Sequence, residues 1–266
     1  MRGAAIGRSA AGVLLAAALA GEGSRADERA VYLAEGEDIR LFDHYDNDGY
    51  SLAVQPGAGG SIRLAVEVSD SPLESAAAFP TGQPRDASLP PAPERDAFAR
   101  EAAAGSRRQA EAVSRILVAV ASRVRYDPDR LRPQDPAAVF ASGLADCVGF
   151  AELSVDLLRR EGIRARTVQG ILRTGPEEQA FEPRIGGSYH RWIEVHYPDR
   201  GWVFSDPSAS INGVDARYIP FRTRSLVRPR SLTLVFVDRS GELSYAPVAA
   251  GPTTLRERAA GSKGGQ

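Results

Sequence analysis

The chain has 266 residues, of which 43% are hydrophobic and 25% are charged, and its formal net charge is −1. This balance is that of a globular protein with room for one sizeable domain and a small companion. Because the charge is near zero and no long basic run occurs, the composition argues against nucleic-acid binding, and nothing in it indicates a structural or membrane-coat role.

Residues 1–20 have the pattern of a secretory signal peptide. Arg2 and Arg8 supply positive charge, and an apolar stretch follows over residues 10–20. Ala18 and Ala20 form an A-x-A cleavage site, so we expect cleavage before Gly21 and export to the periplasm or the extracellular space. The alternative is an uncleaved N-terminal anchor, although a spanning helix needs about 20 apolar residues and this stretch is shorter. After signal cleavage we expect no stable membrane span.

Residues 27–70 are expected to form a small β-rich region. Strand candidates lie at residues 30–33, 51–54 and 61–68. The segment 43–49 resembles a calcium loop, but His44 falls at the first ligand position and Gln55 replaces the expected glutamate. A solvated turn is therefore expected there.

Residues 71–95 are rich in Pro, Ser and Ala and are expected to form a linker or an extended strap. Two helices are expected after it. The first covers residues 94–104, and Ser106 caps the second because Gln109 follows three residues on. Apolar residues at helical spacing predict the buried stripe of the second helix: Val113, Ile116, Leu117, Val120 and Val124.

Cys147 is the only cysteine in the chain, and it precedes an apolar run with helical spacing that ends at Gly162. A thiol in the first turn of a helix loses its proton more easily, because the helix dipole favours negative charge there. The adjacent Asp146 would oppose the thiolate unless its side chain caps the helix. A lone thiol in an exported chain indicates a nucleophile, and the alternative is an inert buried side chain.

The second half of the chain is rich in strand patterns. Strands are expected at residues 163–171, 189–197, 201–205, 233–237 and 243–246, with a loop at 173–187 and a tight hairpin at 197–201. The polar, Gly-rich tail 251–266 is expected to be disordered.

The strand 189–197 carries a candidate general base. His190, Trp192, Glu194 and His196 share one of its faces. An antiparallel hairpin would bring Asp206 back beside His190, where a carboxylate holds the imidazole in the tautomer that a base needs. A helix packed on this sheet would add Cys147 and complete a Cys–His–Asp arrangement. His196 is the rival base, but it is expected to lie on the surface at a strand end.

Three blocks of sequence strongly resemble the core of the transglutaminase-like superfamily. They are Gly143–Ala151 with Leu157–Arg166, then His190–Val195, and then Gly201–Val203 followed by Asp206–Ser208. The resemblance covers about residues 96–210 and implies an α+β, papain-like fold, in which a helix carrying the cysteine packs on an antiparallel sheet carrying the histidine and the aspartate. Arg191 departs from the small apolar residue that is common after the histidine, and the stretch before residue 96 has no match.

The resemblance implies that Cys147, His190 and Asp206 are catalytic, and it matches Tyr126 to an aromatic position that assists the oxyanion in some members. Trp192 and Trp202 are expected to be core residues or pocket walls. The implied activity is thiol-dependent acyl transfer or hydrolysis at amide carbonyls of a protein or peptide substrate.

We expect the transglutaminase-like catalytic domain to cover residues 96–250, which extends beyond the stretch that carries the resemblance. No metal or cofactor is expected, because no Cys/His cluster is present to bind a metal. Water and an amine both remain open as the acceptor, and the alternative function is a non-catalytic protein- or peptide-binding module of the cell envelope on the same fold. No oligomeric state follows from the sequence.

Overall fold

The computed structural model describes residues 29–69, 73–80, 85–129, 131–173, 189–223, 227, 229, 231–237 and 243–250. The expected signal peptide, nearly all of the expected loop 173–187 and the tail from residue 251 lie outside the described residues. Within the described part of the chain, no helix is both long and apolar enough to cross a membrane.

The first layer of the fold is a six-stranded sheet with the order β12-β11-β1-β4-β3-β2. Its strands are β1 (Arg29–Glu35), β2 (Tyr45–Asn47), β3 (Tyr50–Pro56), β4 (Ile62–Val68), β11 (Leu232–Val237) and β12 (Leu243–Ala250), with short 3-10 helices at Glu37–Leu41 and Ala58–Gly60. The predicted N-terminal strands coincide with β1, β3 and β4. The segment predicted as a turn at 43–49 instead contains β2, which pairs with β3.

The last two strands belong to this N-terminal sheet. β11 pairs antiparallel with β1, so that Leu33 lies opposite Val235, and β12 pairs with β11. Both strands lie within residues 96–250, which were expected to form the catalytic domain. Their pairing joins them to the N-terminal β-rich region through β1. Local sequence patterns report strands but not partners that are nearly the whole chain length apart.

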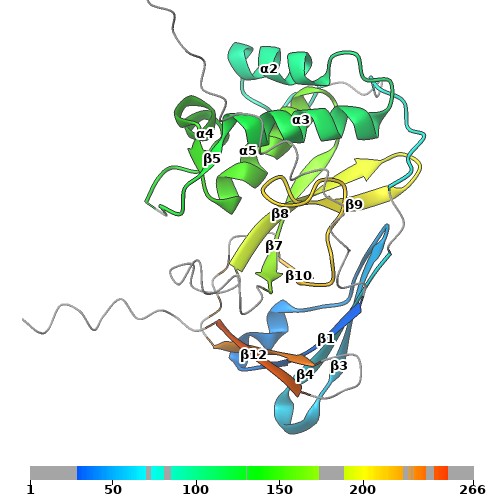
Figure 1. Ribbon diagram of the computed structural model, residues 1–266, viewed down its shortest axis with the longest axis vertical. Coiled ribbons are helices and arrows are strands. Elements are labelled where there is room, and N and C mark those ends of the chain that lie inside the picture. The colour runs from blue at the N-terminus through cyan, green and yellow to red at the C-terminus, as the bar shows by residue number, and fades with distance from the viewer. Residues whose placement is uncertain are drawn as a thin grey trace, which may run out of the picture.

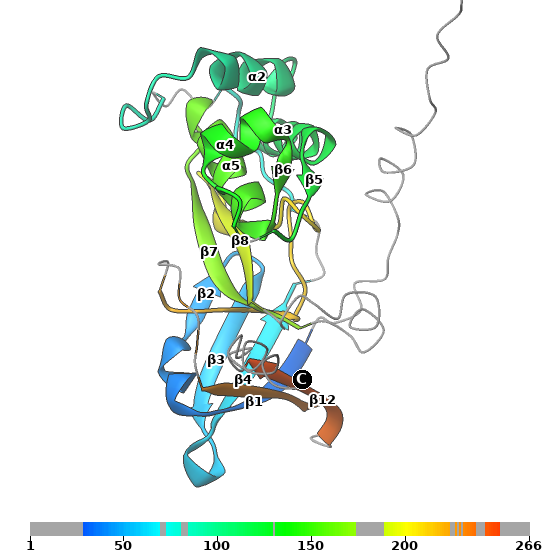
Figure 2. The same ribbon diagram turned by 90° about the vertical axis from the view of Figure 1, so that its left-hand side faces the viewer.

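The second layer is a four-stranded antiparallel sheet, and the third is a group of helices. The sheet has the order β10-β7-β8-β9, from β7 (Ala165–Leu172), β8 (Tyr189–Tyr197), β9 (Gly201–Ser205) and β10 (Tyr218–Pro220). The helices are α2 (Pro93–Ala103), α3 (Gln109–Arg123), α4 (Pro136–Ser142) and α5 (Cys147–Arg160), and a short parallel pair joins β5 (Arg125–Tyr126) to β6 (Leu144–Ala145). Figures 1 and 2 show the helices, the β7–β9 sheet and the N-terminal sheet in succession along the long axis.

The capping box predicted at Ser106 is wrong. α3 begins at Gln109, its N-cap is Arg108, and no side chain caps it. The Ser106 hydroxyl is buried and has no hydrogen-bond partner among the described residues. The carboxylate of Glu111 instead accepts a hydrogen bond of 3.0 Å from the Arg107 backbone, because the N-cap lies two residues later than the pattern predicts.

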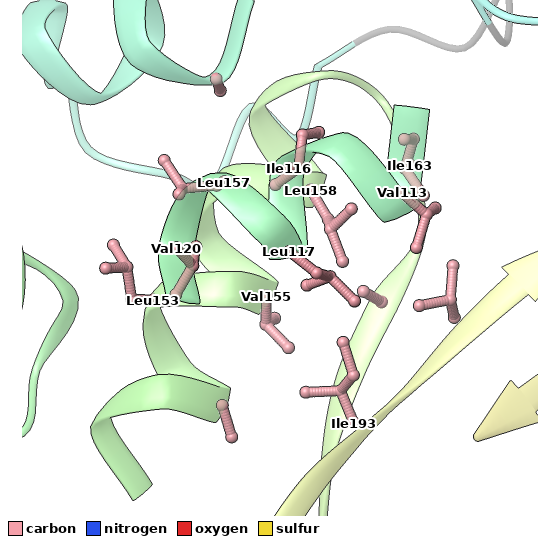
Figure 3. Packing of buried hydrophobic residues seen from close by; sticks show 14 of the residues in the cluster. Val113, Ile116, Leu117, Val120, Leu153, Val155, Leu157, Leu158, Ile163 and Ile193 are labelled. Atoms are coloured by element: carbon pink, nitrogen blue, oxygen red, sulfur yellow. The ribbon is translucent and has the colours of Figure 1, made fainter. Parts of the chain in front are cut away.

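One hydrophobic core lies between the helices and the β7–β9 sheet (Figure 3). The predicted stripe of α3 is buried throughout, and it meets Leu153, Leu157 and Leu158 of α5. Ile193 and Val195 of β8 close this core from the sheet side. Burial of each such side chain contributes about 1.5–3 kcal/mol, so this core fixes α5 on β8.

A second core lies between the two sheets. Trp192 of β8 and Phe204 of β9 meet Tyr32, Tyr50 and Leu64 of the N-terminal sheet, and all five are at most 3% exposed. β8 is therefore buried on both faces, with the side-chain alternation that the sequence predicts. This packing holds the strand that carries His190 rigidly between two cores.

Candidate active site

Cys147 is the first residue of α5, and its side chain is half-buried and free of disulfide bonding. Asp146 is the N-cap, and its carboxylate accepts hydrogen bonds from the backbone N–H groups of Val148 at 2.8 Å and Gly149 at 3.4 Å. The Asp146 carboxylate therefore turns toward the helix terminus and caps it. This is the orientation in which Asp146 was expected not to oppose a thiolate at Cys147. The backbone N–H of Cys147 itself is not used by this cap.

Close packing fixes the position of this helix start. A Cβ atom added at Gly149 would lie 2.3 Å from Oε1 of Gln134 and 2.7 Å from the Cβ of Ala145, so only glycine fits. The same Gln134 oxygen accepts a hydrogen bond of 3.1 Å from the Asp146 backbone. Gln134 therefore holds the residue before Cys147, a role that sequence reasoning missed because Gln134 lies in a loop with no local pattern.

His190 lies in β8 and interacts with both other members of the expected trio. Its Nε2 is 2.5 Å from Oδ2 of Asp206. The side chain of Cys147 is among the groups that raise the pKa of the same ring, and Nδ1 is the ring nitrogen that Asp206 leaves unoccupied. The imidazole stacks on Trp192, with ring centroids 6.1 Å apart, so its orientation is set by packing as well as by hydrogen bonds.

The Asp206 carboxylate is fully buried at the end of β9 and has a complete set of donors. Oδ1 accepts from the backbone N–H and the hydroxyl of Ser208, at 2.8 and 2.7 Å. Oδ2 accepts from the Tyr218 hydroxyl at 2.9 Å in addition to His190. Tyr218 comes from β10, a three-residue strand absent from the predicted elements, so the sequence offered no signal for its role.

The electrostatics of this cluster favour a protonated imidazole beside an ionised carboxylate. Burial acts to lower the pKa of His190, but the charge and hydrogen bond of Asp206, together with Cys147, outweigh it and raise the pKa to about 10. Burial acts to raise the pKa of Asp206, but His190 and Ser208 hold it below its ordinary value. Burial and Asp206 raise the pKa of Tyr218 well above the ordinary value, so its hydroxyl remains a neutral donor.

Tyr126 lies close to the start of α5. It pairs with Ala145 in the short β5–β6 ladder, two residues before Cys147, and its ring stacks on Phe150 with centroids 6.5 Å apart. Tyr126 is 40% exposed, which is unusual for a large aromatic residue among those that the structure describes. This position is compatible with contact to a molecule bound at Cys147.

The two tryptophans differ in their distance from the cluster. Trp192 is a core residue, fully buried beneath His190. Trp202 lies opposite His196 in the β8–β9 ladder, and six residues along a strand span about 20 Å. Trp202 and the rival base His196 therefore belong to the far end of the hairpin, and only His190 meets Asp206. Among the described residues, no group of three His, Cys, Asp or Glu side chains is arranged to hold a metal ion.

Residues 96–207 match the model of the transglutaminase-like superfamily. This matched segment, which is fewer than half of the residues of the chain, is similar to a transglutaminase-like core. It spans α2 to the end of β9 and contains Cys147, His190 and Asp206, in agreement with the resemblance noted over residues 96–210. The papain-like α+β arrangement expected from that resemblance is confirmed, with the cysteine helix α5 packed on the antiparallel sheet that carries the histidine.

A stretch of 77 residues is 34% identical to YebA of Bacillus subtilis (strain 168), which is described as an uncharacterized protein. The match covers 26% of this chain and 10% of YebA, so the chain spans about a tenth of that relative's length.

Two solved structures are similar to the chain. A candidate cysteine protease from Cytophaga hutchinsonii is 10% identical, with a TM-score of 0.46 over 84% of this chain and 90% of that chain. The periplasmic domain of TgpA from Pseudomonas aeruginosa is 14% identical, with a TM-score of 0.37 over 69% of this chain and 89% of that chain.

Proposed function

We propose that the protein is a thiol-dependent acyltransferase or hydrolase that acts on amide or peptide carbonyls of a protein or peptide substrate. Cys147 is the nucleophile, and His190 is the general acid and base. Asp206 orients the imidazole and stabilises its protonated form. The single observation that carries this proposal is the His190 ring, which hydrogen-bonds the buried carboxylate of Asp206 and interacts with Cys147 at the start of α5. A nucleophile, a base and a group that orients the base are the parts that such chemistry needs.

In the first step the Cys147 thiolate attacks the carbonyl carbon of the substrate amide. The C–N bond then breaks as the His190 imidazolium gives its proton to the departing amine, leaving a thioester on Cys147 and a neutral imidazole. Asp206 supports the charged form of the ring before this transfer. The high pKa of His190 favours the starting ion pair.

The developing oxyanion would lie against the N-terminus of α5. The Cys147 backbone N–H is left over by the Asp146 cap and points out of the helix start, where the helix dipole favours negative charge. Tyr126 lies at the same end of the helix, because it pairs with Ala145, two residues before Cys147. Removal of one oxyanion donor typically lowers kcat about 10²–10³-fold.

In the second step an acceptor attacks the thioester carbon while neutral His190 removes its proton. The C–S bond then breaks, and Cys147 leaves as a thiolate beside the protonated imidazole. Water as the acceptor gives hydrolysis, and a primary amine gives transamidation. Both outcomes share the first half-reaction, so a common assay with both acceptors separates them. We further propose that the reaction takes place outside the cytoplasm, a proposal supported by the signal-like pattern of residues 1–20.

The test is a parallel assay on a protein substrate such as casein. Fluorescent amine incorporation and release of new amino termini are measured for the wild type, Cys147→Ser and His190→Gln. We expect the wild type to show one of the two signals, Cys147→Ser to show neither, and His190→Gln to fall about 10²–10⁴-fold.

Asn47→Ala is a matched control, since Asn47 donates to Glu194 on β8, outside the trio. A wild-type signal that survives in Cys147→Ser would refute the assignment of the nucleophile. Absence of thioester formation with any amide substrate, combined with peptide binding, would instead support the non-catalytic binding module.

A further inference from the structure

A hollow in the surface lies at the opposite end of α5 from Cys147. Its volume is about 570 Å³. Its lining comes from the segment before α2, the C-terminal end of α5, the start of β7 and one residue of β9: Arg85, Asp86, Ala87, Arg159, Gly162, Ile163, Arg164, Ala165, Arg166 and Trp202. A 14-residue helix is about 20 Å long, so this hollow is separate from the candidate active site.

The lining contains four guanidinium groups and a single carboxylate, that of Asp86. Arg85 and Arg166 are already paired, with Asp96 and with the buried Glu194. Arg164 is exposed and has no acidic partner within ion-pair distance among the described residues. Arg159 donates its Nε–H to the Ala165 carbonyl and lies 4.0 Å from Asp86, at the limit of an ion pair. Two guanidinium groups thus keep donors that can bind an external anion.

The remaining surfaces of the hollow narrow the kind of anion. The backbone N–H groups of Gly162 and Ile163 are bonded to carbonyls of α5, so no nest of free N–H groups exists there for a compact phosphate. The C-terminus of α5 lies nearby, and its dipole disfavours a group with more than one negative charge close to it. The hollow is also far larger than a single phosphate, and guanidinium forks bind carboxylates with good geometry.

Trp202 supplies an apolar wall and not a stacking platform. The Arg166 guanidinium lies over its ring at 3.7 Å from the centroid, and His196 meets it edge-on at 5.2 Å. Because the ring is already covered in this way, recognition falls to the arginine side chains. This arrangement suits an extended chain with spaced carboxylates better than a flat ligand.

We propose that this hollow is a binding site for an acidic peptide segment, whose carboxylates pair with Arg164 and Arg159 beside Trp202. The site is independent of the reaction proposed at Cys147 and adds a means of holding an acidic region of a protein about 20 Å from the thiol. The pKa of His196, which meets Trp202 edge-on, is lowered by burial and then by the charges of Arg164 and Arg166.

The test is calorimetric titration of the whole protein with a short Glu–Gly repeat peptide and with its Gln–Gly counterpart at pH 7. We expect binding of the Glu peptide alone, weakening with added salt. Arg164→Gln removes a guanidinium that makes no internal ion pair, so it should fold normally and bind about tenfold more weakly. Arg63→Gln, which removes an exposed arginine of β4 outside the hollow, is the matched control and should bind as the wild type does.

Two further readouts locate the site. The imidazole signals of His196 should shift on binding, with a higher pKa, whereas those of His190 should not. Prior alkylation of Cys147 should leave the affinity unchanged, so the outcome does not depend on the proposed reaction. Equal affinity for the Glu and Gln peptides, or full affinity in Arg164→Gln, would overturn the proposal. Tighter binding of inorganic phosphate than of the peptide, with the same dependence on Arg164, would overturn the choice of ligand.

Discussion

At the residue scale, the character of the site depends on one carboxylate. Asp206 is fully buried, yet four hydrogen bonds from His190, Ser208 and Tyr218 keep it ionised. Its charge in turn overcomes the effect of burial on His190 and raises the pKa of that ring. The protonation state of His190, the partner of the Cys147 thiol, therefore depends on the carboxylate of Asp206 on the other side of the ring.

Replacement of this carboxylate by an amide tests that dependence. In Asp206→Asn the shape is retained but the charge is lost, so burial is no longer opposed, and the pKa of His190 should fall from about 10 toward or below its ordinary 6.5. The measurement is an NMR titration of the three histidines, with His44→Gln and His196→Gln used for assignment. A pKa of His190 that is the same in both proteins would show that Asp206 is not the cause.

The raised pKa also predicts how stability varies with pH. The pKa of His190 rises on folding from 6.5 to about 10, so its stabilising contribution is fully present below pH 6.5 and is lost as the pH rises through 10. Urea unfolding of the wild type should therefore show a decrease in the free energy of unfolding over this range. His190→Gln should show a smaller decrease, and equal slopes in the two proteins would count against the ion pair.

At the element scale, the site depends on where α5 begins. Asp146 caps the helix, Gln134 holds the Asp146 backbone, and Gly149 allows the first turn to pack against α4 and β6. The helix itself was predictable, because apolar spacing and Gly162 mark its face and its end. The contacts that fix its first turn were not, since they join a loop residue to the helix across the fold.

Gly149→Ala should disturb this helix start. Its Cβ would lie 2.3 Å from the Gln134 side chain and 2.7 and 2.8 Å from atoms of Ala145 and Val139. Overpacking of this kind costs about 1–3 kcal/mol, and we expect both a lower free energy of unfolding in urea and slower alkylation of Cys147. Ala151→Gly, two residues further along the buried helix, separates general helix weakening from displacement of the thiol. Gly149→Ala with unchanged alkylation would show that the close contact does not position Cys147.

At the scale of the whole molecule, the N-terminal sheet contacts the segment that carries Tyr218, a hydrogen-bond donor to Asp206. The Tyr50 hydroxyl donates to the Tyr218 carbonyl at 2.6 Å, and the Tyr32 hydroxyl donates to the Ala216 carbonyl at 2.8 Å. Tyr218 then bonds Asp206. The β-rich region, which has no counterpart in the matched segment 96–207, thus braces the strand and loop that hold the carboxylate.

Tyr50→Phe tests this support. The ring packing is kept, but the buried Tyr218 carbonyl loses its donor, a loss that costs about 1–3 kcal/mol. We expect reduced stability in urea and a few-fold slower alkylation of Cys147. Tyr45→Phe is the matched control, because Tyr45 stacks on Phe204 in the same core but does not bond β10. If the two variants alkylate at the same rate, the N-terminal sheet does not act on the site.

The sequence was most informative where one local pattern defines an element. Alternation located β8 and β9, and a helical stripe located α5, so the positions of Cys147, His190 and Asp206 followed from one hairpin and one helix. Pairing between distant segments was not predictable, which explains why the patterns at β11 and β12 did not indicate that β11 pairs with β1. Tyr218 and Gln134 escaped notice for the same reason, since their partners are distant in sequence. Trp202 was separated from His190 by the register of the hairpin.

The most direct test of the account is the pH dependence of Cys147 alkylation by iodoacetamide, measured for the wild type and His190→Ala. Cys147 is the only thiol in the chain, so the reaction rate reports on it alone. We expect iodoacetamide to alkylate the wild-type thiol rapidly near neutral pH, because the His190 imidazolium stabilises the thiolate, and we expect His190→Ala to lose this reactivity. Slow reaction of both proteins with the same pH profile would contradict the Cys147–His190 pair and the function built on it.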